Sequence, residues 1–215
     1  MIAIITGDII DSKNLKDQNN WLVPIKTLFS QWGKTPKHWE IYRGDSFQVE
    51  LAKAEEALNV AIQIKAIIKN VSSKKASKRT SPIDVRMAIG IGEKEFDANR
   101  VSESNGEAFI NSGEKFETLK KTKQSLAIQS PWAKFDKDFN LYLKLANIEM
   151  DSWSISSGEL ISAVLKYPKK TQLEIGQLLG IEQNSVSGRY KRTHIEEILE
   201  LDKMYREKLT ELIDK

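Results

Sequence analysis

The sequence predicts an α+β fold, in which an antiparallel sheet with helices on one face precedes an all-helical C-terminal unit. Short apolar runs and alternating apolar residues recur up to residue 128, as expected for strands. After Pro131 the apolar residues recur at helical spacing. The 215 residues can bury a sizeable core and allow one or two domains, and the composition is that of a soluble globular protein.

The N-terminal elements follow the order strand, helix, strand, strand, helix, strand, and a further helix and strand come after them. A short buried strand opens the chain and ends at Thr6-Gly7-Asp8, and the tip of a hairpin lies at residues 43–46. This order is that of the ferredoxin-like fold. The predicted elements span residues 2–5, 21–32, 38–42, 47–51, 54–68, 83–91, 106–119 and 126–128.

The C-terminal residues predict helices at 131–147 and 158–167, a helical pair at 171–192 and a long last helix. Turn and capping residues gather at 150–157, which predicts a boundary between domains 1–150 and 151–215. The last helix carries an apolar stripe, which predicts docking on its own domain or pairing with a second copy. The stripe consists of Ile195, Ile198, Leu199, Leu201, Met204, Tyr205, Leu209 and Leu212.

The segment 171–192 has the pattern of a helix-turn-helix DNA-binding unit. Apolar residues recur at helical spacing up to Leu179, and Gly180 supplies the left-handed residue that the turn needs. Ile181 anchors the turn, and a second helix begins at 182–184 with Val186 facing inward. The alternative is an ordinary helical hairpin with a polar outer face. The side chains predicted to reach bases or phosphates are Gln183, Asn184, Ser185, Ser187, Arg189, Lys191 and Arg192.

The distribution of charge limits this predicted contact. The formal net charge is only +3, but basic residues gather at 166–170 and 189–192, and an acidic run begins at Glu196. Phosphate repels carboxylates, so we expect DNA contact to end near Arg192 or Thr193. A second basic cluster at 69–79 predicts a loop that is either an auxiliary phosphate contact or merely a solvated segment.

Two acidic residues are candidate metal ligands. Asp8 follows the first strand and Asp45 lies at the tip of the predicted hairpin, so adjacent central strands would bring the two carboxylates together. Two carboxylates near a backbone carbonyl suit Mg²⁺ or Mn²⁺, with phosphates completing the shell. The alternative is local, because Asp after Gly also serves as a turn residue that bonds nearby backbone N–H groups.

Four motifs, TGDII at 6–10, YRGDSF at 42–47, VRMAIGIGE at 85–93 and GEAFINSGEKFE at 106–117, resemble those of class III nucleotidyl cyclases and GGDEF domains. The resemblance implies that Asp8 and Asp45 hold metal ions, with the Ile9 backbone as a third contact, and that a nucleotide is the ligand. Asn111 and Lys115 loosely match the Asn and Arg that stabilise the transition state in cyclases. Lysine lacks the planar fork of arginine, which favours binding of a metal–nucleotide over cyclase turnover. Over nearly its full length the chain resembles the SatD family of bacterial proteins.

Other kinds of site find little support in the sequence. The chain has no cysteine, which excludes disulfides and thiolate metal sites and fits a reducing compartment. Its start has no basic region before a short apolar run, so we expect neither a signal peptide nor a membrane helix, and a cytoplasmic location. His38 and His194 are the only histidines, and neither lies in a pattern typical of a triad or zinc site.

Two functions therefore follow as expectations. The first is a DNA-binding transcriptional regulator whose N-terminal domain senses a ligand, such as a nucleotide, or forms a homodimer. The second is a Mg²⁺-dependent nucleotidyl cyclase-like enzyme that acts on a nucleoside triphosphate through Asp8 and Asp45. We favour the first, because the helical pair is nearly complete as a motif and the catalytic set is not.

Overall fold

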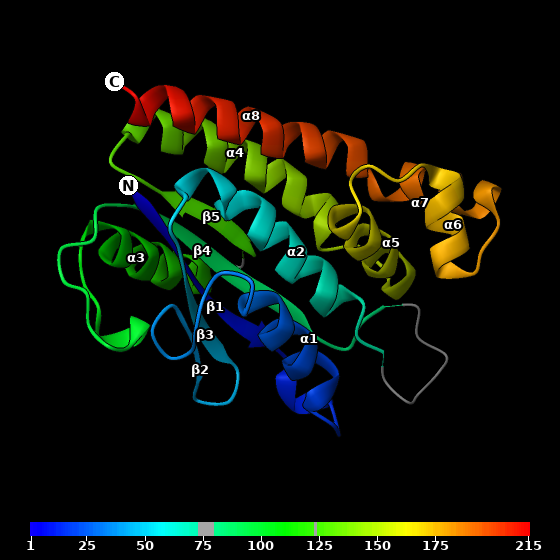
Figure 1. The fold of residues 1–215 in the computed structure, drawn as a ribbon, viewed down its shortest axis with the longest axis horizontal. Helices are drawn as coiled ribbons and strands as arrows, with labels where there is room; N and C mark the ends of the chain where they lie inside the picture. The colour runs from blue at the N-terminus through cyan, green and yellow to red at the C-terminus, as the bar shows by residue number, and fades with distance from the viewer. Residues whose placement is uncertain (73–79, 123) are drawn as a thin grey trace.

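The computed structural model describes residues 1–72, 80–122 and 124–215, so residues 73–79 of the predicted basic loop lie outside the described residues. The fold is α+β, with a five-stranded mixed sheet and its helices followed by an all-helical C-terminal region (Figure 1). The elements are β1 (Ile2–Ile10), α1 (Asn19–Phe29), β2 (Trp39–Tyr42), β3 (Ser46–Leu51), α2 (Ala57–Lys69), β4 (Asp84–Gly92), α3 (Glu107–Thr122), β5 (Leu126–Gln129), α4 (Ala133–Met150), α5 (Ile155–Lys166), α6 (Gln172–Leu179), α7 (Gln183–Thr193) and α8 (Ile195–Ile213), with short 3₁₀ turns at Ser12–Asn14, Ala54–Glu56 and Val101–Glu103.

The strand order is β2-β3-β1-β4-β5, with β1 at the centre. The first four strands pair antiparallel, but β4 and β5 run parallel, so the prediction of a wholly antiparallel sheet was wrong. The cause is the crossover through α3, which returns the chain to the same end of the sheet before β5 begins. The prediction that all helices lie on one face was also wrong, because α3 covers the face opposite α2.

Strand β1 is longer than predicted. The sequence pattern ended the strand at Thr6-Gly7-Asp8, whereas the antiparallel pairing with β4 continues to Ile10. Gly7 lies inside the strand, and its lack of a side chain leaves room for the Phe47 ring. A Cβ at Gly7 would lie 2.4 Å from Phe47 Cζ. Asp8 is therefore part of the central strand and not of the turn after it.

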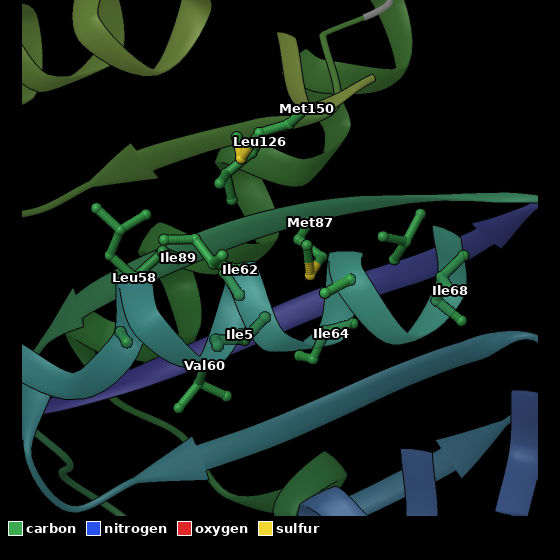
Figure 2. Packing of buried hydrophobic residues seen from close by; sticks show 14 of the residues in the cluster. Ile5, Leu58, Val60, Ile62, Ile64, Ile68, Met87, Ile89, Leu126 and Met150 are labelled. Atoms are coloured by element: carbon green, nitrogen blue, oxygen red, sulfur yellow. The ribbon is translucent and has the colours of Figure 1, made fainter. Parts of the chain in front are cut away.

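Helix α2 is the centre of the molecule. Its residues from Ala57 to Lys69 are buried at most positions, on both sides of the helix. A helix that is apolar on all sides must be covered on all sides. Figure 2 shows the apolar side chains of α2, such as Leu58 and Ile62, lying over those of β1 and β4, among them Ile5 and Ile89.

The other side of α2 is covered by α5, the first helix of the C-terminal region. The two backbones come close at Gly158, where a Cβ would lie 2.6 Å from both the Ala66 carbonyl oxygen and the Asn70 nitrogen. Only glycine permits this approach without a shift of one helix. A side chain as small as a methyl group would therefore separate α5 from α2.

A network of charges built on two buried lysines crosses the same junction. Lys65 Nζ lies 2.6 Å from a carboxylate oxygen of Asp84 and 2.6 Å from one of Asp151, and Lys69 Nζ lies 2.8 Å from the other oxygen of Asp84. Ser125 donates a further hydrogen bond of 2.7 Å to Asp151. The network joins α2, the start of β4 and the residue that follows α4.

Helix α4 covers the open edge of β5. The Asn140 side chain accepts from the Ile128 backbone N–H at 2.9 Å and donates to the Ile128 carbonyl at 2.8 Å. Asn147 donates likewise to the carbonyl of Leu126 at 3.0 Å. These amides take the place of a neighbouring strand, so an edge that would otherwise invite pairing with another chain is closed.

The last helix, α8, docks on its own chain, which is one of the two predicted alternatives. Tyr205 is fully buried and donates a hydrogen bond of 2.8 Å to the Ala54 carbonyl, and Asp202 accepts from Asn59 at 3.1 Å. Burial raises the Asp202 pKa and raises that of Tyr205 well above its ordinary value. The apolar stripe of α8 thus packs against the core of its own chain.

One continuous cluster of buried apolar residues runs from Ala3 in β1 to Leu209 in α8. The predicted division into domains 1–150 and 151–215 stays a prediction, and the apolar core shows no break at that position. Among the described residues, no helix combines the length and apolar character that crossing a membrane would require.

We expect Gly158→Ala to destabilise the fold by about 1–3 kcal/mol, because the added methyl group meets backbone atoms of α2. The matched control is Gly113→Ala in α3, where a Cβ meets nothing within 4 Å. There the substitution should stabilise the helix by roughly 0.5–1 kcal/mol. Urea unfolding of both variants measures the difference; equal effects would show that α2 and α5 do not pack backbone to backbone.

Candidate functional site

The first candidate site is formed by α6 and α7. At its start, Thr171 Oγ1 accepts from the Glu174 backbone N–H at 3.3 Å, and Glu174 accepts from the Thr171 backbone N–H at 2.8 Å. The bonds that the Thr171 backbone N–H and hydroxyl donate to the Glu174 carboxylate hold the pKa of Glu174 below its ordinary value. This capping box was not among the predicted features, although Thr-x-x-Glu before an apolar run is its usual signal.

The turn between α6 and α7 is tight and built from glycines. Gly180 has φ of 65°, and the Ile181 N–H donates to the Gly176 carbonyl at 3.0 Å. A Cβ at Gly176 would lie 2.7 Å from the Ile181 carbonyl oxygen, so the turn folds directly onto α6. Val186 of α7 is fully buried beside Gly176, as predicted.

The start of α7 presents polar side chains to solvent. Gln183, Asn184 and Ser185 are exposed, Ser187 is half-buried, and no acidic residue occupies the first turn of the helix. Lys191 and Arg192 are exposed in the last turn. Six of the seven predicted DNA-contacting residues therefore reach solvent from one short helix.

Arg189 is the exception. Its guanidinium donates to Glu159 Oε2 at 2.6 Å and to the Ser156 carbonyl at 3.3 Å, and only 17% of its side chain is exposed. Both partners belong to α5, which supports α7 from behind. Arg189 therefore holds α7 on α5 and does not lie on the accessible face on which the sequence analysis placed it.

A shallow hollow lies between α6, α7 and the start of α8. Lys191 lines it together with Glu196 and Glu197, which face it from α8. The carboxylates reduce the positive potential at this end of α7. The polar residues in the first half of α7 are therefore the better candidates for contact with a polyanion. The remaining lining residues are Gln172, Ser187, Tyr190 and His194.

The second candidate site surrounds Asp8 on the face of the sheet that α3 covers. Asp8 pairs in register with Arg86 of β4, and its Oδ1 is buried without a hydrogen-bond partner among the described residues. Burial raises the pKa of Asp8, and the charge of Asp45 raises it further, whereas Arg86 and Lys120 lower it. Asp8 is thus a partly buried carboxylate with one unpartnered oxygen and two cationic side chains nearby.

Asp45 lies where the predicted hairpin places it. Its carbonyl accepts from the Ile9 N–H at 2.9 Å, and its side chain accepts from Ser12 Oγ at 3.0 Å. The antiparallel pairing of β1 with β3 thus brings Asp45 next to Asp8 and Ile9, as expected for adjacent central strands. Ser12 is 33 residues away in the chain, so this bond is not the local turn bond to a nearby backbone N–H that was the alternative role of Asp45.

The unpartnered Asp8 oxygen and the Asp45 carboxylate are oxygen ligands of the kind that Mg²⁺ and Mn²⁺ accept, with phosphate oxygens and waters in the other positions. Such an ion would supply charge neutralisation to a bound phosphate. The positive charges of Arg86 and Lys120 beside Asp8 oppose a cation there and favour a phosphate. No group of three or more His, Asp or Glu side chains with metal-binding geometry occurs among the described residues, so the protein contributes at most this pair.

The two weaker catalytic candidates do not join this pair. Asn111 donates to the Ile91 carbonyl at 2.8 Å and accepts from Gln129 at 3.1 Å, so its amide is used within the fold. Ile91 lies five residues along β4 from Arg86, the register partner of Asp8, a separation of about 17 Å. Burial raises the pKa of Asp136, and the charge of Lys115 on α3 partly opposes this shift, so Lys115 lies near Asp136.

The two histidines hold local structure. His38 Nδ1 accepts from the Lys34 backbone N–H at 3.1 Å just before β2. His194 has φ of 45° and joins α7 to α8, where it is the residue that caps the start of α8.

Asp8→Asn should stabilise the protein at neutral pH by on the order of 1 kcal/mol, because it removes a buried, incompletely bonded charge. The folded-state pKa of Asp8 lies above its ordinary value of 3.8, so the stability it contributes is complete below pH 3.8 and is lost as pH rises through the folded-state pKa. The two proteins should therefore differ at pH 7 and converge near pH 3.8. Urea unfolding across this range, without divalent cations, measures the difference.

The control is Asp214→Asn, which changes an exposed carboxylate after the end of α8. It should leave the pH dependence of unfolding as it is in the wild type. A decrease in stability for Asp8→Asn at pH 7 would mean that the ionised carboxylate has a stabilising partner.

A search of protein-family models found no match to the chain, and neither did a search of curated proteins. Its function is therefore inferred from its own residues and their geometry.

Proposed function

We propose that the protein is a DNA-binding transcriptional regulator, in which α6 and α7 form a helix-turn-helix unit and the sheet senses a ligand or supports a dimer. One observation carries this proposal. A short helix, α7, follows a tight glycine turn, buries Val186 and exposes Gln183, Asn184 and Ser185 at its start. In helix-turn-helix proteins the N-terminal residues of the second helix contact base edges in the major groove.

The chemistry of the exposed residues supports this docking. Asn and Gln amides match adenine in the major groove, and serine hydroxyls accept or donate to several bases. Arg192 and Lys191 lie one to two turns further on, where phosphate contacts would set the register of the helix on the duplex. The carboxylates of Glu196 and Glu197 then end the contact surface.

For the N-terminal part we propose a ferredoxin-like, nucleotidyl cyclase-like arrangement. The support is the sheet order β2-β3-β1-β4, with Asp8 inside β1 near its end and Asp45 in the turn that leads into β3. With the C-terminal helices, this arrangement agrees with the resemblance to the SatD family. A nucleotide–Mg²⁺ complex at Asp8 would be the sensed ligand.

Arg192→Ala should weaken binding to a mixed-sequence DNA duplex and reduce the slope of log K against log salt by about one, because one phosphate contact is lost. Gln183→Ala and Asn184→Ala should instead relax the sequence preference at a cost of about 1–3 kcal/mol each, measured on duplexes selected from a randomised pool. Fluorescence anisotropy over a salt series separates the two effects.

Lys203→Ala is the matched control for charge, because the Lys203 side chain is 75% exposed on α8, away from the proposed contact surface. It should bind DNA as the wild type does. Equal binding by wild type, Arg192→Ala and the two α7 variants would refute the assigned surface.

The alternative function, a nucleotidyl cyclase-like enzyme, has one observation in its favour. Asp8 Oδ1 is buried and unpartnered next to Asp45, as a carboxylate would be that awaits a cation. The positions of Asn111 and Lys115 argue against turnover, since both lie away from this pair. The residues therefore support binding of a nucleotide but not its conversion to a product.

Calorimetric titration with ATP and GTP in the presence of Mg²⁺ tests this site. We expect binding by the wild type, at least a tenfold loss in Asp8→Asn and Asp45→Asn as the metal ligands are removed, and no loss in Asp214→Asn. Chromatography of the same mixtures shows whether product forms. Product that disappears in Asp8→Asn would establish the enzyme, and no binding at all would exclude both roles for the pair.

A further inference from the structure

Helix α4 has three sides, and one of them is uncovered. Phe135 and Phe139 face Tyr205 of α8, with ring centroids 6.0 and 5.8 Å apart, and Asn140 and Asn147 bond the edge of β5. The remaining side carries large apolar residues in solvent: Leu141 is 56% exposed, Tyr142 39%, Leu145 59% and Ile148 72%.

These residues form a stripe and not a scatter. Leu141, Leu145 and Ile148 are spaced by four and three residues, which is the spacing of a coiled-coil seam, and they lie on one line along the helix. Helix α8, where the sequence analysis placed the pairing stripe, is docked within the chain. Helix α4 therefore offers the apolar helix face that α8 does not.

We propose that the exposed face of α4 binds the same face of a second copy of this chain, with the two α4 helices parallel. The charged residues on either side of the stripe favour the parallel orientation. Lys144 borders the stripe on one side and Glu149 borders it on the other, five residues further along. In a parallel helix pair, a residue on one flank meets the residue five positions later on the opposite flank of the partner.

Parallel pairing therefore sets Lys144 of each copy against Glu149 of the other, in two equivalent ion pairs. Antiparallel pairing about a two-fold axis would instead bring like flanks together, Lys144 against Lys144. Lys144 is exposed and Glu149 is half-exposed, so both side chains can reach across the seam. The charges of Lys144 and Glu149 are thus complementary to those of a second copy of this chain, and only in the parallel orientation.

The parallel arrangement has a consequence for the proposed DNA contact, and in this respect the inference rests on the proposed function. The units α5 to α7 follow the C-terminal end of α4 (Figure 1). A two-fold axis along α4 places both units at the same end of the dimer. Two recognition helices on one side are what binding to paired half-sites requires.

Analytical ultracentrifugation of the full chain without DNA tests the dimer. The wild type should sediment as a dimer in the micromolar range, and Leu145→Asp and Ile148→Asp should sediment as monomers with wild-type circular dichroism. Val23→Asp is the matched control, because Val23 is a 56% exposed apolar residue on α1, and it should stay dimeric. A monomeric wild type, or a dimer that survives both α4 substitutions, overturns the inference.

Charge reversal tests the orientation. Lys144→Glu and Glu149→Lys should each weaken the dimer by about tenfold, and the double variant should regain the wild-type affinity. No weakening by the single variants, or no recovery in the double variant, overturns the parallel pairing. Because mass is measured without DNA, a dimer that fails to bind DNA refutes only the proposed function, and a monomer that binds DNA refutes only this inference.

Discussion

The charge network of Lys65, Lys69, Asp84 and Asp151 is the interaction on which the arrangement of the chain depends. The two lysines are buried, and their ammonium groups lie 2.6–2.8 Å from carboxylates of Asp84 and Asp151, whose side chains are 25% and 43% exposed. Such a network adds little net stability over apolar packing, but removing Asp84, the carboxylate that both lysines share, would leave buried positive charge without its nearest partner. We interpret its value as geometric, because only one placement of α2, β4 and the end of α4 satisfies all four groups.

This placement fixes the C-terminal helices relative to the sheet. Immediately after Asp151, Trp153 is buried and its indole N–H donates to the Thr193 carbonyl at the end of α7. Gly158 then brings α5 against α2, and the Arg189–Glu159 ion pair holds α7 on α5. Each of these contacts lies behind the exposed residues of α7 and not among them. The exposed surface of α7 is therefore presented by a rigid support, which lowers the ordering cost of any contact it makes.

The local features of the fold could be predicted from the sequence, and the features set by distant packing could not. The Gly180 turn and the hairpin turn that contains Asp45 depend on backbone preferences of a few residues, so their signals lie in short motifs. The length of β1 depends on its pairing with the distant strand β4, and the role of Arg189 depends on Glu159, thirty residues away in the chain. The parallel β5 and the position of α3 follow from a crossover that no local pattern encodes. For the Asp8 pair, the strand neighbours were predictable, but the cationic surroundings and the separation from Asn111 were not.

Asp8 lies two residues before the end of the β1–β4 ladder, where the charge network begins. On the β1–β4 ladder Asp8 pairs with Arg86, and the pair at the end of that ladder is Ile10 with Asp84, whose carboxylate belongs to the charge network. A ligand at Asp8 would therefore lie close to Asp84 on the same ladder. Asp84 is paired with Lys65 of α2, and Lys65 is also paired with Asp151. Contiguity alone does not couple two sites; the ligand must favour one of two arrangements of an element between them. The network of Lys65, Lys69, Asp84 and Asp151 has one observed arrangement, so a ligand at Asp8 would affect the C-terminal helices only by displacing Asp84 from Lys65 and Lys69.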